Sequence, residues 1–259
     1  MRAKHSPVVH AGERINRERI RSGRTNPDGQ AVSNKILLSI SEDEFRKIRP
    51  YLEFVNLPQY FTLHEPHEKL QFAYFLNGGL ASIVVAMRGG KSVEAGVVGY
   101  EGAVGTGLAV GVYKNPFCEV IQIAGDGFRI SARALQTTLE RAAELRFKLS
   151  RYAVLQGIQV AQTAACNRLH DVGQRLARWL LMAQDRVNSR RLPITHDFLA
   201  TMLGADRPSV SLAARKLQQK KAIHYNRGDV EILNRKRLEA SACECYRVIQ
   251  QLNGDLGLL

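Results

Sequence analysis

Residues 193–217 read PITHDFLATMLGADRPSVSLAARKL, and this stretch decides the fold of the C-terminal part of the chain. Thr195 is a favourable N-cap for a first helix, and Gly204 can end that helix in the left-handed conformation that a sharp turn needs. Asp206 can bind the free amides of a second helix, whose first position suits Pro208 because its missing N–H costs nothing there. Two helices joined by a short turn with glycine predict a helix–turn–helix.

The second helix, expected over residues 208–220, has an apolar side and a polar side. The apolar positions recur at spacings of three and four and are expected to face inward: Val210, Ala213, Ala214 and Leu217. The remaining positions are mostly short hydroxyls and basic side chains: Arg207, Ser209, Ser211, Leu212, Arg215 and Lys216. Arginine binds guanine O6 and N7, while hydroxyl and basic groups hold phosphates, so this surface suits the DNA major groove.

Residues 222–233, AIHYNRGDVEIL, follow the second helix and predict a β-hairpin. Two short β-like runs flank the turn sequence at 226–229, which would carry Arg227 at its tip. A helix pair followed by such a hairpin is a winged helix, and the wing tip would bring Arg227 to the DNA backbone. An αα-hairpin in a small structural domain is the alternative.

The net charge of the 259-residue chain is +13, and it is unevenly distributed. Residues 168–237 hold 15 Lys/Arg against 6 Asp/Glu, a net of +9, while residues 36–167 hold 13 against 12. So basic a segment suits a polyanion such as nucleic acid, although a solvated basic surface is the alternative. Residues 1–35 hold 8 Lys/Arg against 3 Asp/Glu with few apolar anchors, which predicts a disordered arm.

Residues 52–130 show a different pattern. Short runs rich in Val, Ile, Phe and Tyr are separated by turn residues, with strong turn signals at 77–79 and 88–90. This pattern predicts an antiparallel, sensor-like β-domain over residues 36–131.

A helical pattern follows the β-domain. Ser131 can cap it, and we expect one long dimerisation helix over residues 132–167, ahead of a DNA-binding domain over residues 168–259. Its apolar stripe fits packing on the same helix of a second copy: Leu145, Leu149, Tyr152, Leu155 and Ile158. Packing on its own β-domain is the alternative, and both can hold along different turns.

This order of elements resembles the superfamily of the cyclic-AMP receptor protein and the fumarate–nitrate reductase regulator (Crp/Fnr) over residues 36–250. The resemblance is most specific at 195–217, and GVVGYEGAVG at 96–105 adds to it. It implies an α+β fold with an N-terminal antiparallel β-roll like the cyclic-nucleotide-binding jelly roll, a long dimerisation helix and a C-terminal winged helix–turn–helix. It also implies a homodimeric transcription regulator, not an enzyme, that binds a pseudo-palindromic double-stranded operator with half-sites about 34 Å apart.

The resemblance assigns roles to individual residues of the second domain. It implies base reading by Arg207, Ser211 and Leu212, and Leu212 would contact a thymine methyl where the family has an arginine. It implies phosphate contacts by Thr195 and His196. The polar side of the second helix adds Ser209, Arg215 and Lys216 as expected phosphate contacts, and the wing tip adds Arg227. Pro208 replaces a frequent glutamate, so the operator sequence is not predicted. If the protein activates transcription, RNA polymerase is a further partner.

The β-domain departs from the family at the effector site. Gly99, Glu101 and Gly102 match the first half of the cyclic-nucleotide cassette and are candidate effector-pocket residues. Residues 103–117 contain no arginine, and a buried cyclic phosphate would lack its main charge-assisted contact without one. We therefore expect no cofactor, disfavour a cyclic nucleotide and leave any effector unassigned.

The cysteines do not indicate a disulfide framework or a complete metal site. Cys166 and His170 lie one helical turn apart, which supplies half of a tetrahedral site. Cys243 and Cys245 form CxC rather than the CxxC of zinc sites. We therefore expect a buried thiol, a polar histidine, no metal and reduced cysteines.

Two functions remain possible from the residues alone. The first is DNA-binding regulation, and the alternative is a small-molecule-sensing regulator whose basic C-terminal domain binds RNA or a protein. An enzyme is not expected, because GYEGAVGTG at 99–107 follows no Rossmann-like strand–helix pattern and has no Walker lysine. With no long apolar run and no secretory signal, we expect a cytoplasmic protein without membrane contact.

Overall fold

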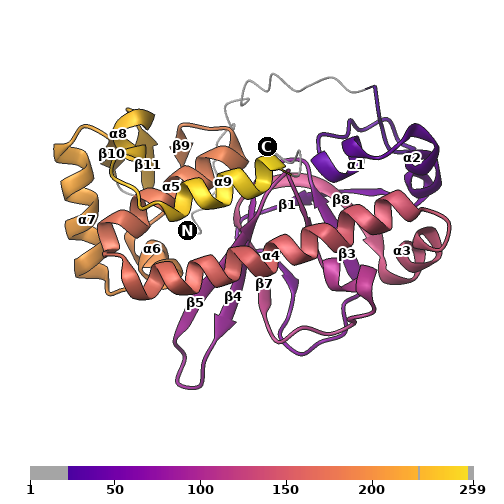
Figure 1. Cartoon of the computed structure of the whole chain (residues 1–259), viewed down its shortest axis with the longest axis horizontal. Helices are drawn as coiled ribbons and strands as arrows, with labels where there is room; N and C mark the ends of the chain where they lie inside the picture. Colours follow the sequence, from indigo (N-terminus) through magenta and orange to yellow (C-terminus); the bar gives the residue numbers. More distant parts are fainter. Residues whose placement is uncertain (1–22, 227, 256–259) are drawn as a thin grey trace, which may run out of the picture.

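The computed structural model describes residues 23–226 and 228–255. A β-roll occupies the centre, the long helix α4 (Ala143–Leu169) runs across it, and a winged helix–turn–helix lies at one end (Figure 1). This architecture confirms the predicted fold class.

The β-roll consists of two four-stranded antiparallel sheets with strand orders β1-β8-β3-β6 and β2-β7-β4-β5. Its strands are β1 (Glu53–Leu57), β2 (Thr62–His64), β3 (Phe72–Leu76), β4 (Leu80–Ala86), β5 (Ser92–Val98), β6 (Ala103–Val104), β7 (Cys118–Ile123) and β8 (Gly125–Ser131). A 3-10 segment, η2 (Thr106–Val110), follows β6. The sheets enclose a core in which Phe75, Phe128 and Ile121 are fully buried.

The N-terminal segment packs onto the β-roll before the first strand. Helices α1 (Lys35–Ser39) and α2 (Glu42–Ile48) lead into the 3-10 segment η1 (Arg49–Tyr51). The prediction of a disordered arm is wrong for residues 23–35. The Asn34 amide donates to Leu76 O at 2.9 Å and Gly102 O at 2.7 Å, so side-chain hydrogen bonds anchor a segment that has few apolar residues. Residues 1–22 of the predicted arm lie outside the described residues.

The predicted single helix over 132–167 is two helices, α3 (Ala132–Leu139) and α4. The predicted cap at Ser131 is confirmed for α3, because the Ser131 hydroxyl accepts from Ala134 N. The second helix begins where Glu44 of α2 accepts the amides of Glu144 at 2.9 Å and Leu145 at 2.6 Å. A carboxylate from a distant segment therefore satisfies the free amides at the start of α4.

The apolar stripe of α4 packs mainly within its own chain. Four of its five members are buried: Leu145, Leu149, Tyr152 and Leu155. Ile158 is 39% exposed, and Phe147 and Val154, on the other side of the helix, are 60% and 65% exposed. The first turns of α4 therefore pack on the β-roll of the same chain, which was the alternative prediction. A different apolar face of α4 is exposed.

A second core includes Leu180, Leu199 and Val210 of the C-terminal domain and continues into the β-roll through Leu80, Val97 and Ile123. The elements of the C-terminal domain are α5 (Val172–Val187), β9 (Arg191–Leu192), α6 (His196–Leu203), α7 (Arg207–Gln219), β10 (Ile223–Asn226), β11 (Asp229–Ile232), α8 (Arg235–Glu239) and α9 (Cys245–Asp255). The strands form a sheet of order β10-β11-β9, and α9 lies beside α4 (Figure 1). No helix in the described part of the chain has the length and apolar character to cross a membrane.

Candidate nucleic-acid interface

The helix–turn–helix forms through the local signals that the sequence predicts. The Thr195 side chain accepts from Phe198 N at 3.2 Å, and Gly204 ends α6 with a φ of 56°. The Asp206 carboxylate accepts from Ser209 N at 2.8 Å and caps α7, with Pro208 in the first turn. These contacts fix the angle between α6 and α7.

Helix α7 buries its apolar side and projects the other side at one end of the molecule (Figure 1). The predicted inward positions are buried: Val210, Ala213, Ala214 and Leu217. The Arg207 side chain is 66% exposed and Leu212 is 52% exposed, while Arg215 and Lys216 are also exposed. An exposed leucine among basic side chains can contact an apolar group such as a thymine methyl.

Arg207 is held by a carboxylate of the preceding helix. Its Nε lies 3.2 Å from Asp197 Oδ1, and both side chains are 66% exposed. An ion pair this exposed contributes at most about 1 kcal/mol. A base edge or phosphate can therefore replace Asp197 as the partner of Arg207.

Ser211 and His196, an expected base-reading residue and an expected phosphate contact, have partners within the protein. Ser211 Oγ and His196 Nδ1 share a hydrogen bond of 3.0 Å, so the hydroxyl is turned toward α6. The His196 ring stacks on Tyr225 with centroids 3.8 Å apart. Burial lowers the pKa of His196, and the nearby Arg207 lowers it further. The stacked imidazole joins α6 to the wing, and its lowered pKa favours the uncharged form.

The wing is attached to both helices. Its strands pair antiparallel from Ile223↔Ile232 to Asn226↔Asp229, which confirms the predicted hairpin. Tyr225 N donates to Gln218 Oε1 of α7 at 2.9 Å, and His196 N donates to the Tyr225 hydroxyl at 3.2 Å. Arg227, the expected phosphate contact at the tip, lies outside the described residues.

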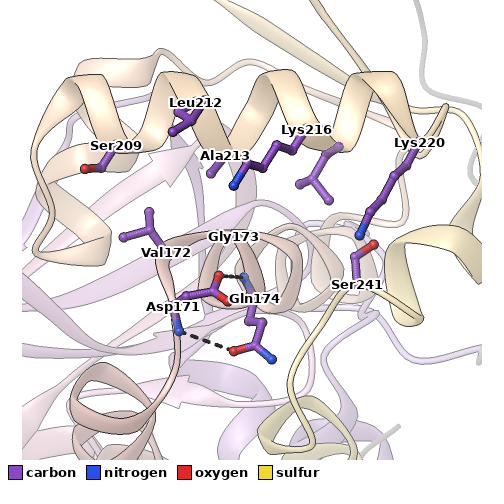
Figure 2. Close-up of a pocket in the computed structure, with 11 residues that line it drawn as sticks. Asp171, Val172, Gly173, Gln174, Ser209, Leu212, Ala213, Lys216, Lys220 and Ser241 are labelled. Carbon is purple, nitrogen blue, oxygen red and sulfur yellow. Dashed lines mark hydrogen bonds between the residues drawn. The ribbon is translucent and has the colours of Figure 1, made fainter.

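A groove of about 480 Å³ runs between α7 and the start of α5. Lys216 and Lys220 extend from α7 toward this groove (Figure 2). The start of α5 is closed by a capping box, in which Asp171 Oδ1 accepts from Gln174 N at 3.0 Å. The two lysines favour an anion such as a DNA phosphate, whereas the start of α5 is already capped by Asp171. Lys220 is not among the phosphate contacts predicted from the sequence.

Protein side chains occupy the space beside the candidate effector-pocket residues. Glu101 is fully buried and its Oε1 pairs with Arg186 Nε of α5 at 2.8 Å. A Cβ added to Gly102 would lie 1.9 Å from Tyr152, and one added to Gly99 would lie 2.6 Å from Arg186. The expectation of an effector pocket at these positions is corrected accordingly: the glycines admit side chains of α4 and α5, and the carboxylate binds an arginine of the C-terminal domain.

A second buried polar contact joins β5 to α5. The Glu94 carboxylate accepts from Trp179 Nε1 at 2.8 Å, and it also bonds to the Ser82 hydroxyl. Burial raises the pKa of the Glu94 carboxyl to about 7, although Ser82 and Trp179 favour its charged form. Its ionisation therefore falls within the physiological pH range.

Glu94→Gln is expected to flatten the dependence of stability on pH. The folded chain holds a proton on Glu94 between its ordinary pKa near 4.5 and its folded pKa of about 7. Stability from this group is present below the lower value and is lost as pH rises through the upper one. Urea unfolding at a series of pH values should show the variant losing about 1–3 kcal/mol less between about pH 5 and about pH 8. Identical profiles for both chains would contradict this expectation.

Comparison with known proteins identifies the C-terminal domain. Residues 174–241 match the family model described as the Crp-like helix-turn-helix domain. The c-di-GMP responsive global regulator CLP of Xanthomonas campestris is 16% identical, with a TM-score of 0.61 and coverage of 74% of this chain and 99% of that one. FixK2 from Bradyrhizobium japonicum is 11% identical, with a TM-score of 0.61 and coverage of 74% and 98%. A CRP-family transcriptional regulator from Thermus thermophilus is 21% identical, with a TM-score of 0.59 and coverage of 73% and 96%.

No curated protein matches the chain in sequence. The solved structures establish the fold, and the family model establishes the helix–turn–helix domain, as the sequence resemblance predicted. The Xanthomonas and Thermus proteins are described as regulators, and none of the three is described as an enzyme.

Proposed function

We propose that the protein is a homodimeric transcription regulator that binds specific double-stranded DNA through α7. The observation that carries this proposal is the exposed face of α7, where Arg207 and Leu212 project from a Crp-like helix–turn–helix. A rod that begins with an arginine and protrudes at one end of the molecule suits the major groove. Such a regulator would act in the cytoplasm, where chromosomal DNA lies in bacteria.

Charge and shape around α7 support binding to a duplex. Residues 168–237 carry a net charge of +9, and Arg215, Lys216 and Lys220 are exposed on or directly after the helix proposed to read bases. Phosphate contacts of this kind place the protein on the duplex, while base contacts select the sequence. A pseudo-palindromic operator follows if two copies bind with two-fold symmetry.

Selection from a pool of random duplexes tests the proposal. The purified full chain should retain one two-fold-related sequence, with affinity falling steeply as salt rises because several phosphates are contacted. Equal retention of all duplexes, or preference for RNA of the same length, would favour the alternative partner classes. RNA polymerase is a further proposed partner if the protein activates transcription.

We also propose that the β-roll binds no cyclic nucleotide at the position where the Crp/Fnr cassette holds one. Arg186 and Tyr152 occupy the space beside Glu101 and Gly102, so the pocket is already filled. Repeating the selection with added cyclic AMP should leave the retained sequence and its yield unchanged. A changed yield would show that a nucleotide acts on this chain.

The open face of α4 supports the homodimer. Its members recur at spacings of three, four and seven and include small residues that allow close approach: Phe147, Val154, Ile158, Ala161 and Ala165. Phe147 and Val154 are among the most exposed large apolar residues of the described chain. A seam with this repeat is typical of paired helices.

Val154→Glu is expected to convert the dimer into a monomer. The substitution places a carboxylate on the seam of both copies, where it would be desolvated opposite its own counterpart. Light scattering coupled to size-exclusion chromatography should give the 28.9 kDa chain mass for the variant and twice that mass for the wild type. Val160→Glu, on the same helix but outside the seam, serves as the matched control and should stay dimeric. Equal masses for the two variants would contradict the assignment of this face.

A further inference from the structure

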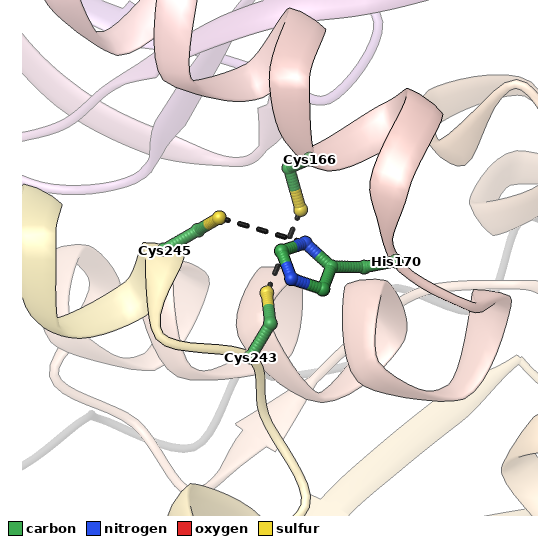
Figure 3. Close-up of side chains that lie close together, drawn as sticks. All are labelled: Cys166, His170, Cys243 and Cys245. Carbon is green, nitrogen blue, oxygen red and sulfur yellow. Dashed lines mark hydrogen bonds between the residues drawn. The ribbon is translucent and has the colours of Figure 1, made fainter.

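Four potential metal ligands from separate segments meet at the junction of α4 and α5. Cys166 lies in the last turn of α4, His170 follows that helix, and Cys243 and Cys245 stand ahead of or at the start of α9. We call these four residues the Cys3His cluster. Their ligand atoms all lie within 4.8 Å of one another, and the side chains point toward a common centre (Figure 3).

The spacing within the Cys3His cluster fits a single tetrahedral ion. The Sγ atoms of Cys166 and Cys243 are 3.5 Å apart, and Cys245 Sγ lies 3.7 Å from His170 Nδ1. Zn–S bonds of about 2.3 Å and Zn–N bonds of about 2.0 Å separate tetrahedral ligands by about 3.5–3.8 Å. An iron–sulfur cluster needs space for several irons and sulfides between its cysteines, which so compact a set does not leave.

The imidazole is oriented as in known zinc sites. Its Nδ1 faces the thiols, while its Nε2 lies 3.2 Å from Glu244 Oε2, the residue between the two cysteines of the CxC pair. A histidine that binds a metal through one nitrogen usually donates the other N–H to a carboxylate. Gln162, one turn before Cys166 on α4, donates from Nε2 to Cys245 Sγ at 3.0 Å. The outer partners of the ligands are therefore also present.

Two buried arginines lie close enough to the Cys3His cluster to balance the negative charge that bound thiolates would bring. Arg175 and Arg178 of α5 are 9% and 7% exposed, and both interact electrostatically with Cys166. Among the described residues neither forms an ion pair with a carboxylate, and Arg175 Nε is buried without a hydrogen-bond partner. Three thiolates, a neutral imidazole and Zn²⁺ leave one negative charge, which these guanidinium groups can balance.

We propose that the Cys3His cluster binds one Zn²⁺ ion in a closed structural site. Three thiolates and an imidazole are soft to intermediate ligands, which favour zinc over Ca²⁺ or Mg²⁺. Cys166, Cys243 and Cys245 are 0%, 4% and 1% exposed, and four protein ligands leave no open position for a substrate. In the sequence, the Cys166–His170 pair and the CxC pair are far apart, and neither pair alone predicts a metal site. The fold brings the two pairs together.

The ion would fasten the start of α9 to the junction of α4 and α5. Cys166 and Cys243 are 77 positions apart in sequence, and α9, which follows the CxC pair, packs on both α4 and α5. Zinc would therefore fix the direction in which α5 leaves α4. Its effect on α7 rests on the proposed DNA binding, whereas the occupancy of the site does not.

Metal analysis of the full chain tests the proposal. Protein expressed in zinc-supplemented medium and freed of loose metal by gel filtration should contain one zinc per chain by mass spectrometry. Cys243→Ser should lose most of that zinc, while Cys118→Ser, which removes the cysteine of β7, should keep it. Equal zinc contents in the two variants would overturn the site.

A spectroscopic titration makes the result independent of variant folding. Co²⁺ added to the metal-free wild-type chain should give the visible bands of tetrahedral Co²⁺ and a thiolate charge-transfer band, both saturating at one equivalent. Absence of these bands together with absence of zinc, or a disulfide between Cys166 and Cys243 in the fresh protein, would also overturn the proposal. Both readouts need no DNA, so they stand or fall separately from the proposed function.

Glu244→Gln tests whether the carboxylate positions the imidazole. Zinc affinity, measured by competition with a chromophoric chelator, should fall by about 10–100-fold because the outer hydrogen bond is weakened. Glu231→Gln, on β11 and outside the cluster, is the matched control and should leave the affinity unchanged. An unchanged affinity in Glu244→Gln would remove the carboxylate from the proposed site.

Discussion

Replacing Arg186 with methionine is expected to lower the free energy of unfolding by about 3–5 kcal/mol, because it leaves a buried carboxylate unpaired. Arg186 is 3% exposed and pairs at 2.8 Å with Glu101, which is fully buried. Methionine fills much of the same volume, but it leaves the carboxylate without a countercharge in a dry environment. Urea unfolding at neutral pH measures the loss.

Two controls separate the buried charge from other causes. The double variant Arg186→Met with Glu101→Gln should recover most of the loss, since no unpaired charge remains. Arg129→Met removes a pair of the same 2.8 Å length, between Arg129 and Glu53, whose side chains are 39% and 58% exposed. It should cost at most about 1 kcal/mol. A similar loss in both single variants would show that burial does not decide the outcome.

Arg207→Ala is expected to weaken binding to the selected duplex by about 1–3 kcal/mol, or roughly 5–150-fold, with little change on random duplex. The guanidinium is exposed at the front of α7, and it gives up only the weak ion pair with Asp197 when it contacts a base. Competition between labelled operator and unlabelled random duplex measures both affinities for each variant.

The matched control for Arg207→Ala is Arg215→Ala on the same helix. Arg215 is expected to hold a phosphate, so its loss should weaken binding to both duplexes equally and reduce the salt slope by about one. Asp197→Asn should leave the preference for the selected duplex intact. A uniform loss in Arg207→Ala would place that arginine on the backbone instead of on a base.

The helix–turn–helix was predictable from sequence because its signals are local. Thr195, Gly204 and Asp206 act on groups no more than a few positions away, so residue type and spacing suffice. The order of β-domain, helix and winged helix was predictable for a similar reason. Apolar periodicity and turn residues report the state of each segment without knowledge of its neighbours.

Features that depend on distant partners could not be predicted. Glu101 resembles a cassette carboxylate until its partner, 85 positions later, proves to be Arg186. The side of α4 that remains open depends on where the β-roll packs, which the helical repeat alone does not show. His196 resembles a phosphate contact until the wing places Tyr225 against its ring. The two halves of the Cys3His cluster likewise meet only through the tertiary fold.

The stacking of Tyr225 on His196, together with its hydrogen bonds to both helices, has a kinetic consequence. It holds α6, α7 and the wing in one arrangement, so the proposed binding to a duplex would cost little conformational entropy. Related operators should then be engaged at similar speeds and differ mainly in dwell time. Discrimination among sites on a chromosome would accordingly be decided by how long the protein stays.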